Sequence, residues 1–212
     1  MYRRIAPALI LALAPISLLA QDKQDEFSGP QAGEKLTSFT TKAILGDQAG
    51  KEIDLVKSAA GKPVLIVFVH ERNRPTVGLA RLLGIYAATK KADGLTSGIV
   101  FLTPDATMTE EWMKVAKGAL PAGVPIGIST DGQEGPGAYG LNRKVQMTIL
   151  VGNKDKVTAN FALVQPSLQA DCPKIAQAVV DALGGGKGPT IEELQKLDPR
   201  PAYTGQERKK KE

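Results

Sequence analysis

The chain has 212 residues, 42% of them hydrophobic and 23% charged, with a formal net charge of +5. Arg3 and Arg4 contribute two of these charges, and residues 207–212, with four basic side chains against two glutamates, contribute two more. The body between them is close to neutral and gives little support for nucleic-acid binding, which needs a basic face on the fold. The single cysteine and single histidine exclude an intrachain disulfide and a multi-histidine metal site.

Residues 1–20 have the pattern of a secretory signal peptide. Two arginines precede an apolar run over residues 5–19, which is followed by a small-residue cleavage site. The run is short and is interrupted by Pro7 and Pro15, which argues against a transmembrane helix; an uncleaved anchor is the alternative. We therefore expect an exported protein, periplasmic or extracellular, with no stable membrane anchor after signal cleavage.

The remaining sequence predicts one α/β domain over residues 33–184, preceded by a disordered segment over residues 21–32. Strands are predicted at residues 39–45, 51–55, 64–69, 98–102, 125–129, 145–151 and 157–163. Helices are predicted at residues 76–91, 109–120 and 171–183, the last with Pro173 in its first turn. A triple glycine separates this domain from a flexible basic tail over residues 185–212, with a short helix at 191–197.

The most informative segment is the strand over residues 64–69 and the loop His70-Glu71-Arg72-Asn73-Arg74-Pro75-Thr76 that follows it. A buried strand that delivers a loop and a helix N-terminus is a place where α/β folds often carry their chemistry. This loop, however, contains no cysteine, no serine and no glycine-rich cradle. The scaffold of a site is present without the usual reactive atoms.

Two stretches carry a resemblance to a known family. Residues 50–55 (GKEIDL) and 61–68 (GKPVLIVF) resemble the opening of the redoxin branch of the thioredoxin-like superfamily, which includes peroxiredoxins and exported thiol-disulfide proteins. Tyr139-Gly140-Leu141, before the predicted hairpin, is a second match. The resemblance implies a thioredoxin-like three-layer α/β/α sandwich with a mixed central sheet.

The resemblance also indicates where thiols are missing. Two cysteines of a C-x-P-C loop would fall at Asn73 and Thr76, around Pro75, and a peroxiredoxin cysteine would fall at Arg74. Dithiol exchange and peroxide reduction need a sulfur nucleophile, which none of these side chains supplies. The cis-proline that faces this loop in thioredoxins corresponds to Gln146, where a cis peptide would cost about 3 kcal/mol. The resemblance therefore implies that the loop Arg72 to Thr76, with Gln146 opposite, is a degenerate active site.

Cys172 is the only candidate thiol, and three interpretations stay open for it. At the start of the last helix its pKa would be lowered and the thiol would be reactive. It would otherwise be an inert, partly buried residue, which we favour because no basic neighbour or second thiol supports it. An intermolecular disulfide is the third option for an unpaired cysteine outside the cell.

Other candidates give weaker signals. Arg72, Asn73 and Arg74 precede a helix start and would suit a phosphate, sulfate or carboxylate, against the alternative of a solvated turn. His70 is expected to end its strand and face solvent. Trp112 is expected in the core or at the edge of a groove. The scattered acidic residues show no metal-binding spacing, and no cofactor is indicated.

Together these observations predict an exported, redox-inactive binding or structural module. The expected partner is another exported protein, docked on the degenerate active-site face around residues 72–76 and Gln146. The alternative is an enzyme, a thiol-dependent oxidoreductase or antioxidant protein that uses Cys172.

Overall fold

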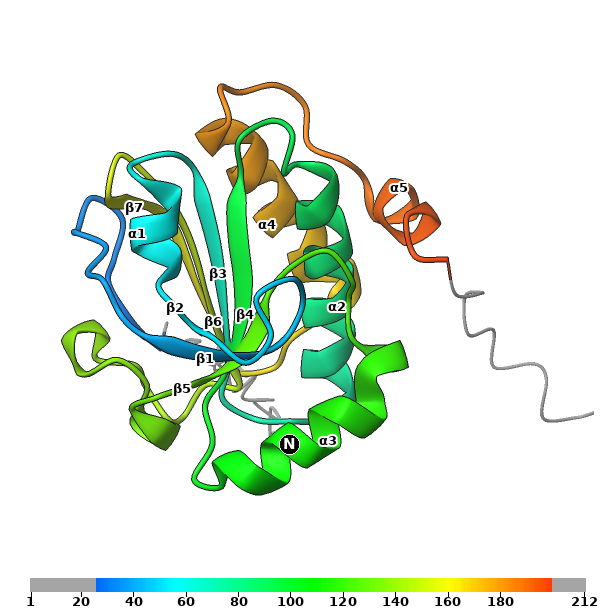
Figure 1. Cartoon of the computed structure of the whole chain (residues 1–212). Helices are drawn as coiled ribbons and strands as arrows, with labels where there is room; N and C mark the ends of the chain where they lie inside the picture. Colours follow the sequence, from blue (N-terminus) through cyan, green and yellow to red (C-terminus); the bar gives the residue numbers. More distant parts are fainter. Residues whose placement is uncertain (1–25, 200–212) are drawn as a thin grey trace, which may run out of the picture.

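A computed structural model describes residues 26–199, which are organised on one mixed seven-stranded sheet (Figure 1). The strands lie in the order β2-β1-β5-β4-β3-β6-β7. Their bounds are β1 Thr41–Leu45, β2 Glu52–Ile53, β3 Val64–Val69, β4 Thr96–Phe101, β5 Ile126–Ser129, β6 Met147–Asn153 and β7 Lys156–Leu163. The helices are α1 Leu55–Ala59, α2 Arg74–Thr89, α3 Ala106–Val115, α4 Leu168–Ala182 and α5 Ile191–Lys196, with 3-10 turns η1 Ala116–Ala119, η2 Gly132–Glu134 and η3 Gly137–Tyr139.

Strand β3 lies near the middle of the sheet and leads directly into the loop that the sequence analysis singled out. All six of its side chains are buried. It runs parallel to β4 and antiparallel to β6, so that Val67 faces Ile99 on one side and Ile149 on the other. A strand covered on both faces has a continuous apolar sequence, as the prediction for residues 64–69 required.

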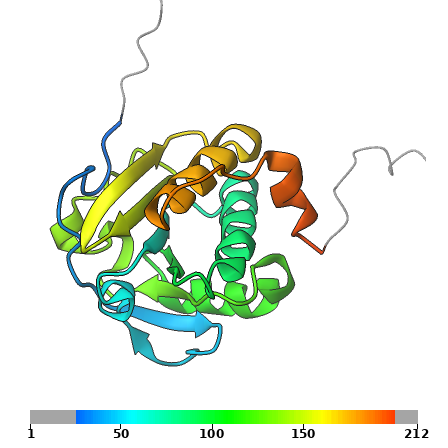
Figure 2. The ribbon, with the colours of Figure 1, turned by 90° about the horizontal axis from the view of Figure 1, so that it is seen from above.

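The side chains of β3 alternate between two hydrophobic cores. Residues 65, 67 and 69 pack in the larger core with α2, α3 and α4, whereas residues 64, 66 and 68 pack in the smaller core with α1. Figures 1 and 2 show α2 and α4 along one face of the sheet and the short α1 on the other. Right-handed crossovers between the parallel strands β3, β4 and β5 place α2 and α3 on the same face. The predicted three-layer sandwich with a mixed sheet is confirmed.

Helix α1 replaces a predicted strand end and turn. The side chain of Asp54 accepts a hydrogen bond from the N–H of Lys57 (3.0 Å) and so caps a helix where the sequence predicted a strand to residue 55. Only Glu52–Ile53 pair as β2. Leu55 and Val56 are buried against the smaller core, and this packing outweighs the weak intrinsic preference of a five-residue helix.

The amino-terminal segment is ordered over the residues that the structure describes, which corrects the prediction of disorder for residues 26–32. Ser28 is 1% exposed, and its hydroxyl lies 2.5 Å from that of Thr148. Asn160 donates from its side chain to the carbonyl groups of Ser28 and Pro30, at 2.8 Å each. Residues 21–25, like the predicted signal peptide, lie outside the described part of the chain.

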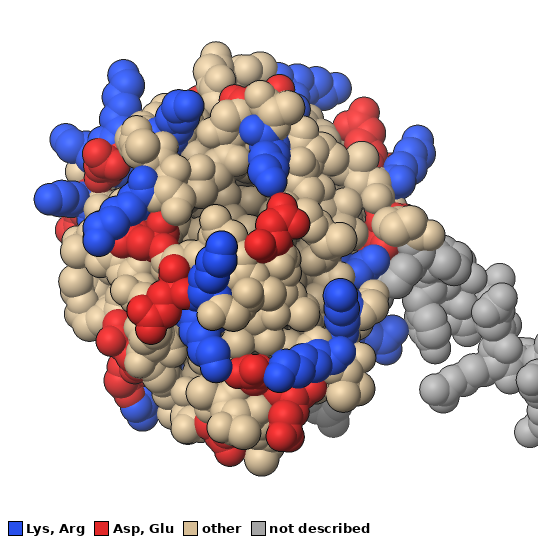
Figure 3. All heavy atoms as spheres, in the orientation of Figure 1, with Lys and Arg blue, Asp and Glu red and all other residues tan. Residues whose placement is uncertain are grey.

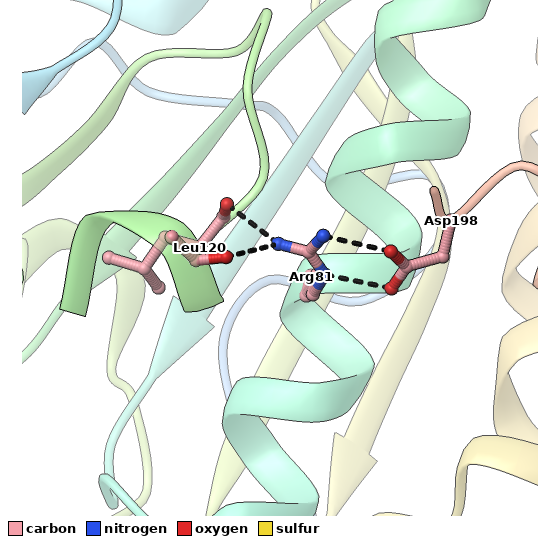
Figure 4. Close-up of polar contacts among 4 residues, drawn as sticks. Arg81, Leu120 and Asp198 are labelled. Atoms are coloured by element: carbon pink, nitrogen blue, oxygen red, sulfur yellow. Dashed lines mark hydrogen bonds and ion pairs between the residues drawn. The ribbon is translucent and has the colours of Figure 1, made fainter. Parts of the chain in front are cut away.

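The carboxy-terminal segment is also more ordered than predicted. Leu194 of α5 is fully buried, and Asp198 forms a bidentate ion pair with Arg81 of α2, with both N–O distances 2.8 Å. The Arg81 guanidinium also donates to the carbonyl groups of Leu120 (2.9 Å) and Gly118 (3.2 Å) (Figure 4). The predicted flexible tail is therefore wrong for residues 191–199, where α5 and Asp198 pack on the domain; residues 200–212 lie outside the described range.

Two surface observations bear on the sequence expectations. Between residues 26 and 199 no helix is long and apolar enough to cross a membrane. On the side of the molecule that Figure 3 shows, basic and acidic side chains are interspersed without a large patch of either sign. This side therefore offers no extended basic surface of the kind that nucleic-acid binding uses.

Candidate functional site

Asn73 ends the loop after β3 and forms the N-cap of α2. Its side-chain oxygen accepts a hydrogen bond from the N–H of Thr76 (3.0 Å), and the Thr76 hydroxyl accepts one from the N–H of Asn73 (3.1 Å). Pro75 lies in the first turn, where its missing N–H costs nothing. Asparagine and threonine thus cap the helix reciprocally, at the two positions where the resemblance would place cysteines.

Gln146 faces this cap across the loop. The Asn73 side-chain amide donates to the side-chain oxygen of Gln146 at 3.0 Å. The Gln146 carbonyl accepts from the N–H groups of His70 (2.9 Å) and Glu71 (3.2 Å). The described residues contain no cis peptide bond, so Gln146 connects to β6 without the feature that thioredoxins have there.

The chemistry open to this cluster is limited. Thr76 is fully buried, and its hydroxyl lies 2.7 Å from the carbonyl of Glu71 and 3.0 Å from that of Asn73. Carboxamide and alcohol groups held in such hydrogen bonds cannot act as the thiolate of a dithiol or peroxidatic centre. The arrangement fixes the loop and presents side chains at its surface.

Arg72 is an exposed residue at the surface of this loop. Its guanidinium lies 4.7 Å from the ring centroid of Trp112, a cation–π distance. Trp112 is half-buried and packs on Phe101 with ring centroids 5.6 Å apart, so it lies at the edge of the core, as predicted. Arg74 and Pro75 are exposed beside it. The first-turn N–H of Thr76 is already taken by Asn73, which leaves an anion fewer donors than the sequence suggested.

His70 follows the last residue of β3 and is half-buried, so it is less exposed to solvent than expected. Its Nε2 lies 2.8 Å from the hydroxyl of Thr148, which in turn contacts Ser28. Burial lowers the pKa of His70 from 6.5 to about 4, so the ring is neutral at physiological pH. Sequence reasoning missed Ser28 and Thr148, since neither lies in a motif and they are 120 residues apart.

Cys172 is buried in the second turn of α4, away from the helix start that the sequence predicted. Helix α4 begins three residues earlier than expected, at Leu168, with Ser167 as its N-cap, and Pro173 lies inside it. The cysteine is fully buried in the larger core, and this burial, with a smaller effect of Asp171, raises the pKa of its thiol to about 12. The interpretation as a reactive thiol at a helix N-terminus is therefore wrong, and the favoured inert residue fits its place in the core.

Two exposed apolar side chains adjoin residues that are hydrogen-bonded to Gln146 or linked through hydrogen bonds to His70. Phe27, 71% exposed, precedes Ser28 of the His70 chain of hydrogen bonds. Val164, 44% exposed, follows Leu163, whose carbonyl accepts from the N–H of Gln146 at 2.8 Å. Among residues 26–199 no group of three or more histidine, cysteine or acidic side chains is arranged to hold a metal ion.

Comparison with known proteins gives structural neighbours only. No protein-family model matches the chain, and no curated protein matches it. A proposed thiol:disulfide interchange protein DsbE from Chlorobium tepidum is similar at 24% identity and a TM-score of 0.57, over 73% of this chain and 99% of its own. Protein SMc02350 from Sinorhizobium meliloti (16%, TM-score 0.52, covering 78% and 89%) and a proposed thioredoxin from Neisseria meningitidis (17%, TM-score 0.50, covering 70% and 90%) are also similar.

These likenesses agree with the topology of the chain. The mixed seven-stranded sheet with helices on both faces is consistent with the fold of such proteins. The single cysteine of the sequence is buried on α4 and is not at a disulfide site. The chain therefore has the thioredoxin-like fold.

Proposed function

We propose that this protein is an exported thioredoxin-fold module that binds another exported protein and carries out no thiol redox chemistry. The observation that carries the proposal is the reciprocal cap between Asn73 and Thr76, which occupies the place of both thiols with neutral, hydrogen-bonded groups. Cys172 does not replace them, because it lies buried in the core with a raised pKa.

The loop face supplies the groups that a protein partner would use. Tryptophan and arginine are enriched among the residues that dominate binding energy in protein interfaces, and Arg72 stacks on Trp112 beside the cap. Val164, which follows the residue whose carbonyl accepts from Gln146, adds exposed apolar surface. These features support a docking face around residues 72–76 and Gln146, the face predicted from the resemblance.

The redox half of the proposal is tested by activity assays. Wild type and Cys172→Ser are compared in insulin-disulfide reduction and in peroxide consumption, with an active thioredoxin as the positive control. We expect both forms to remain at the uncatalysed background, since the buried thiol is protonated at neutral pH. Turnover in the wild type that disappears in Cys172→Ser would establish the alternative, a thiol-dependent oxidoreductase.

The binding half is tested by site-specific photocrosslinking in the native host. A crosslinker at Arg72 should form an adduct with a discrete exported protein, and Arg74→Ala should weaken the adduct. A crosslinker at Lys154, in the β6–β7 turn at the other end of the sheet, serves as the matched control. Equal adducts from both positions, or none from Arg72, would contradict docking on this face. Cell fractionation in the same host tests export, with a form lacking residues 1–20 expected to stay inside the cell.

A further inference from the structure

A cavity of about 310 Å³ lies at the end of the sheet opposite to the Asn73 loop. It is bordered by Lys62, just before β3, and by Thr96 and Ser97 at the start of β4. Thr96 faces Val64, the first residue of β3, whereas the Asn73 loop follows the last residue of β3. The cavity is therefore separate from the degenerate active site, and its volume is at the lower end of the range for small-molecule sites.

The floor of the cavity is apolar. Leu55 from the smaller core and Leu95 and Val124 from the larger core line it, and each is 3% exposed. Ala88 of α2 and Pro125 form further apolar wall. A ligand that entered here would cover side chains from both cores, so the floor favours an apolar body.

The rim of the cavity carries a net positive charge. Lys62 forms no ion pair with any residue between 26 and 199. Lys91 lies 3.7 Å from Asp47, a pair with both side chains largely exposed, which contributes little. Thr96 and Ser97 also line the cavity and carry hydroxyl groups that can donate to an anion. Two ammonium groups against one carboxylate favour an anionic head group.

The helix ends near the cavity do not oppose an anion. The last carbonyl groups of α2 accept hydrogen bonds from the turn that follows, including Leu95 N–H to Lys90 oxygen at 3.2 Å and Lys91 N–H to Ala88 oxygen at 3.4 Å. At the end of α1 the Ala59 carbonyl accepts from the Lys62 N–H at 2.9 Å. These carbonyl groups are thus already satisfied, and the lysine side chains remain for a ligand.

We infer that this cavity binds a small organic carboxylate with an apolar body. The carboxylate would lie against Lys62, Lys91 and the hydroxyl groups of β4, and the body would lie against Leu55, Leu95 and Val124. The inference is independent of the proposed function, because it uses no residue of the Asn73 loop.

The test is an NMR titration of the isotopically labelled protein with benzoate and with hexanoate. Saturable shifts are expected at residues 94–97 and 123–125. The double variant Lys62→Gln/Lys91→Gln should raise the apparent Kd about tenfold or more, because it removes charge-assisted contacts to the carboxylate. The matched control Lys154→Gln should leave the Kd unchanged.

Two further probes separate the charge from the apolar body. Benzyl alcohol, which lacks the carboxylate, and inorganic phosphate, which lacks the body, should each bind more weakly than benzoate. The inference is overturned if neither carboxylate gives saturable shifts, if the shifts lie elsewhere, or if the double lysine variant binds like the wild type. Benzyl alcohol or phosphate binding as tightly as benzoate would overturn the assigned ligand class.

Discussion

Asn73 shows how one residue can keep a helix start while removing its reactivity. The N-terminus of α2 leaves backbone N–H groups that need an acceptor, and asparagine is among the best residues for that task. Here its side chain accepts from Thr76 and donates to Gln146, so one residue caps the helix and links the loop to the residue that precedes β6. The position that the resemblance assigned to a cysteine thus has a structural role.

His70 makes a testable contribution to the pH dependence of stability. Its pKa is about 4 in the folded protein and 6.5 in an unfolded chain. At neutral pH both states are uncharged, but between pH 6.5 and 4 only the unfolded chain takes up the proton. The free energy of unfolding should therefore fall as the pH falls through this window, by up to about 3 kcal/mol.

Urea denaturation at pH 7 and near pH 4 measures this effect. His70→Gln keeps an amide that can bond to Thr148 but does not titrate in the window, so its loss of stability over the same range should be smaller than that of the wild type. Equal losses in the two proteins would show that His70 is not the group responsible.

The elements that were predicted well are those with strong local patterns. Strand β3 is apolar throughout, and α2 begins with an N-cap asparagine and a first-turn proline that the sequence displays. The observed bounds of both elements therefore lie within two residues of the predicted bounds. Helix α1 was missed because five residues carry no clear period. The packing of its Leu55 against Gly98 is formed only in the fold. The His70 environment was missed for the same reason at longer range, since Ser28 meets Thr148 only through the fold.

Two glycines in α2 give opposite predictions for the same substitution. An ideal Cβ at Gly84 would lie 2.8 Å from Pro121 Cβ and closer still to its Cγ, whereas at Gly78 it would meet nothing within 4 Å. Alanine is favoured over glycine in a helix by up to about 1 kcal/mol, and overpacking costs about 1–3 kcal/mol. Gly78→Ala should therefore raise the free energy of unfolding, and Gly84→Ala should lower it by about 1–2 kcal/mol.

Thermal or urea unfolding of the two single variants decides this prediction. Each serves as the control for the other, because helix propensity is common to both and only the neighbouring atoms differ. A gain of stability in Gly84→Ala would mean that the Pro121 turn moves away from α2 at little cost.

At the scale of the whole molecule, the carboxy-terminal segment is the largest departure from the sequence prediction. A triple glycine followed by charged residues is typical of a linker and a flexible tail. The structure agrees with this pattern only at the linker. Beyond it, Leu194 enters the core and Asp198 reaches Arg81, which lies 117 residues earlier. An arginine within a helical pattern gives no sign of a distant partner, so this contact could not be predicted from the sequence.

The ion pair between Arg81 and Asp198 should contribute strongly to stability because the Arg81 side chain is only 7% exposed. Asp198→Ala removes the carboxylate partner of the buried Arg81 guanidinium, which then keeps only the carbonyl groups of Gly118 and Leu120 as acceptors. We therefore expect the free energy of unfolding to fall by about 3 kcal/mol. Arg81→Leu/Asp198→Leu should recover much of this, since an apolar pair leaves no buried charge. Asp93→Ala, which breaks the surface pair with Lys90, should cost at most about 1 kcal/mol. Urea denaturation of these variants measures the three values; a loss in Asp198→Ala no larger than that in Asp93→Ala would show that another contact holds the segment to α2.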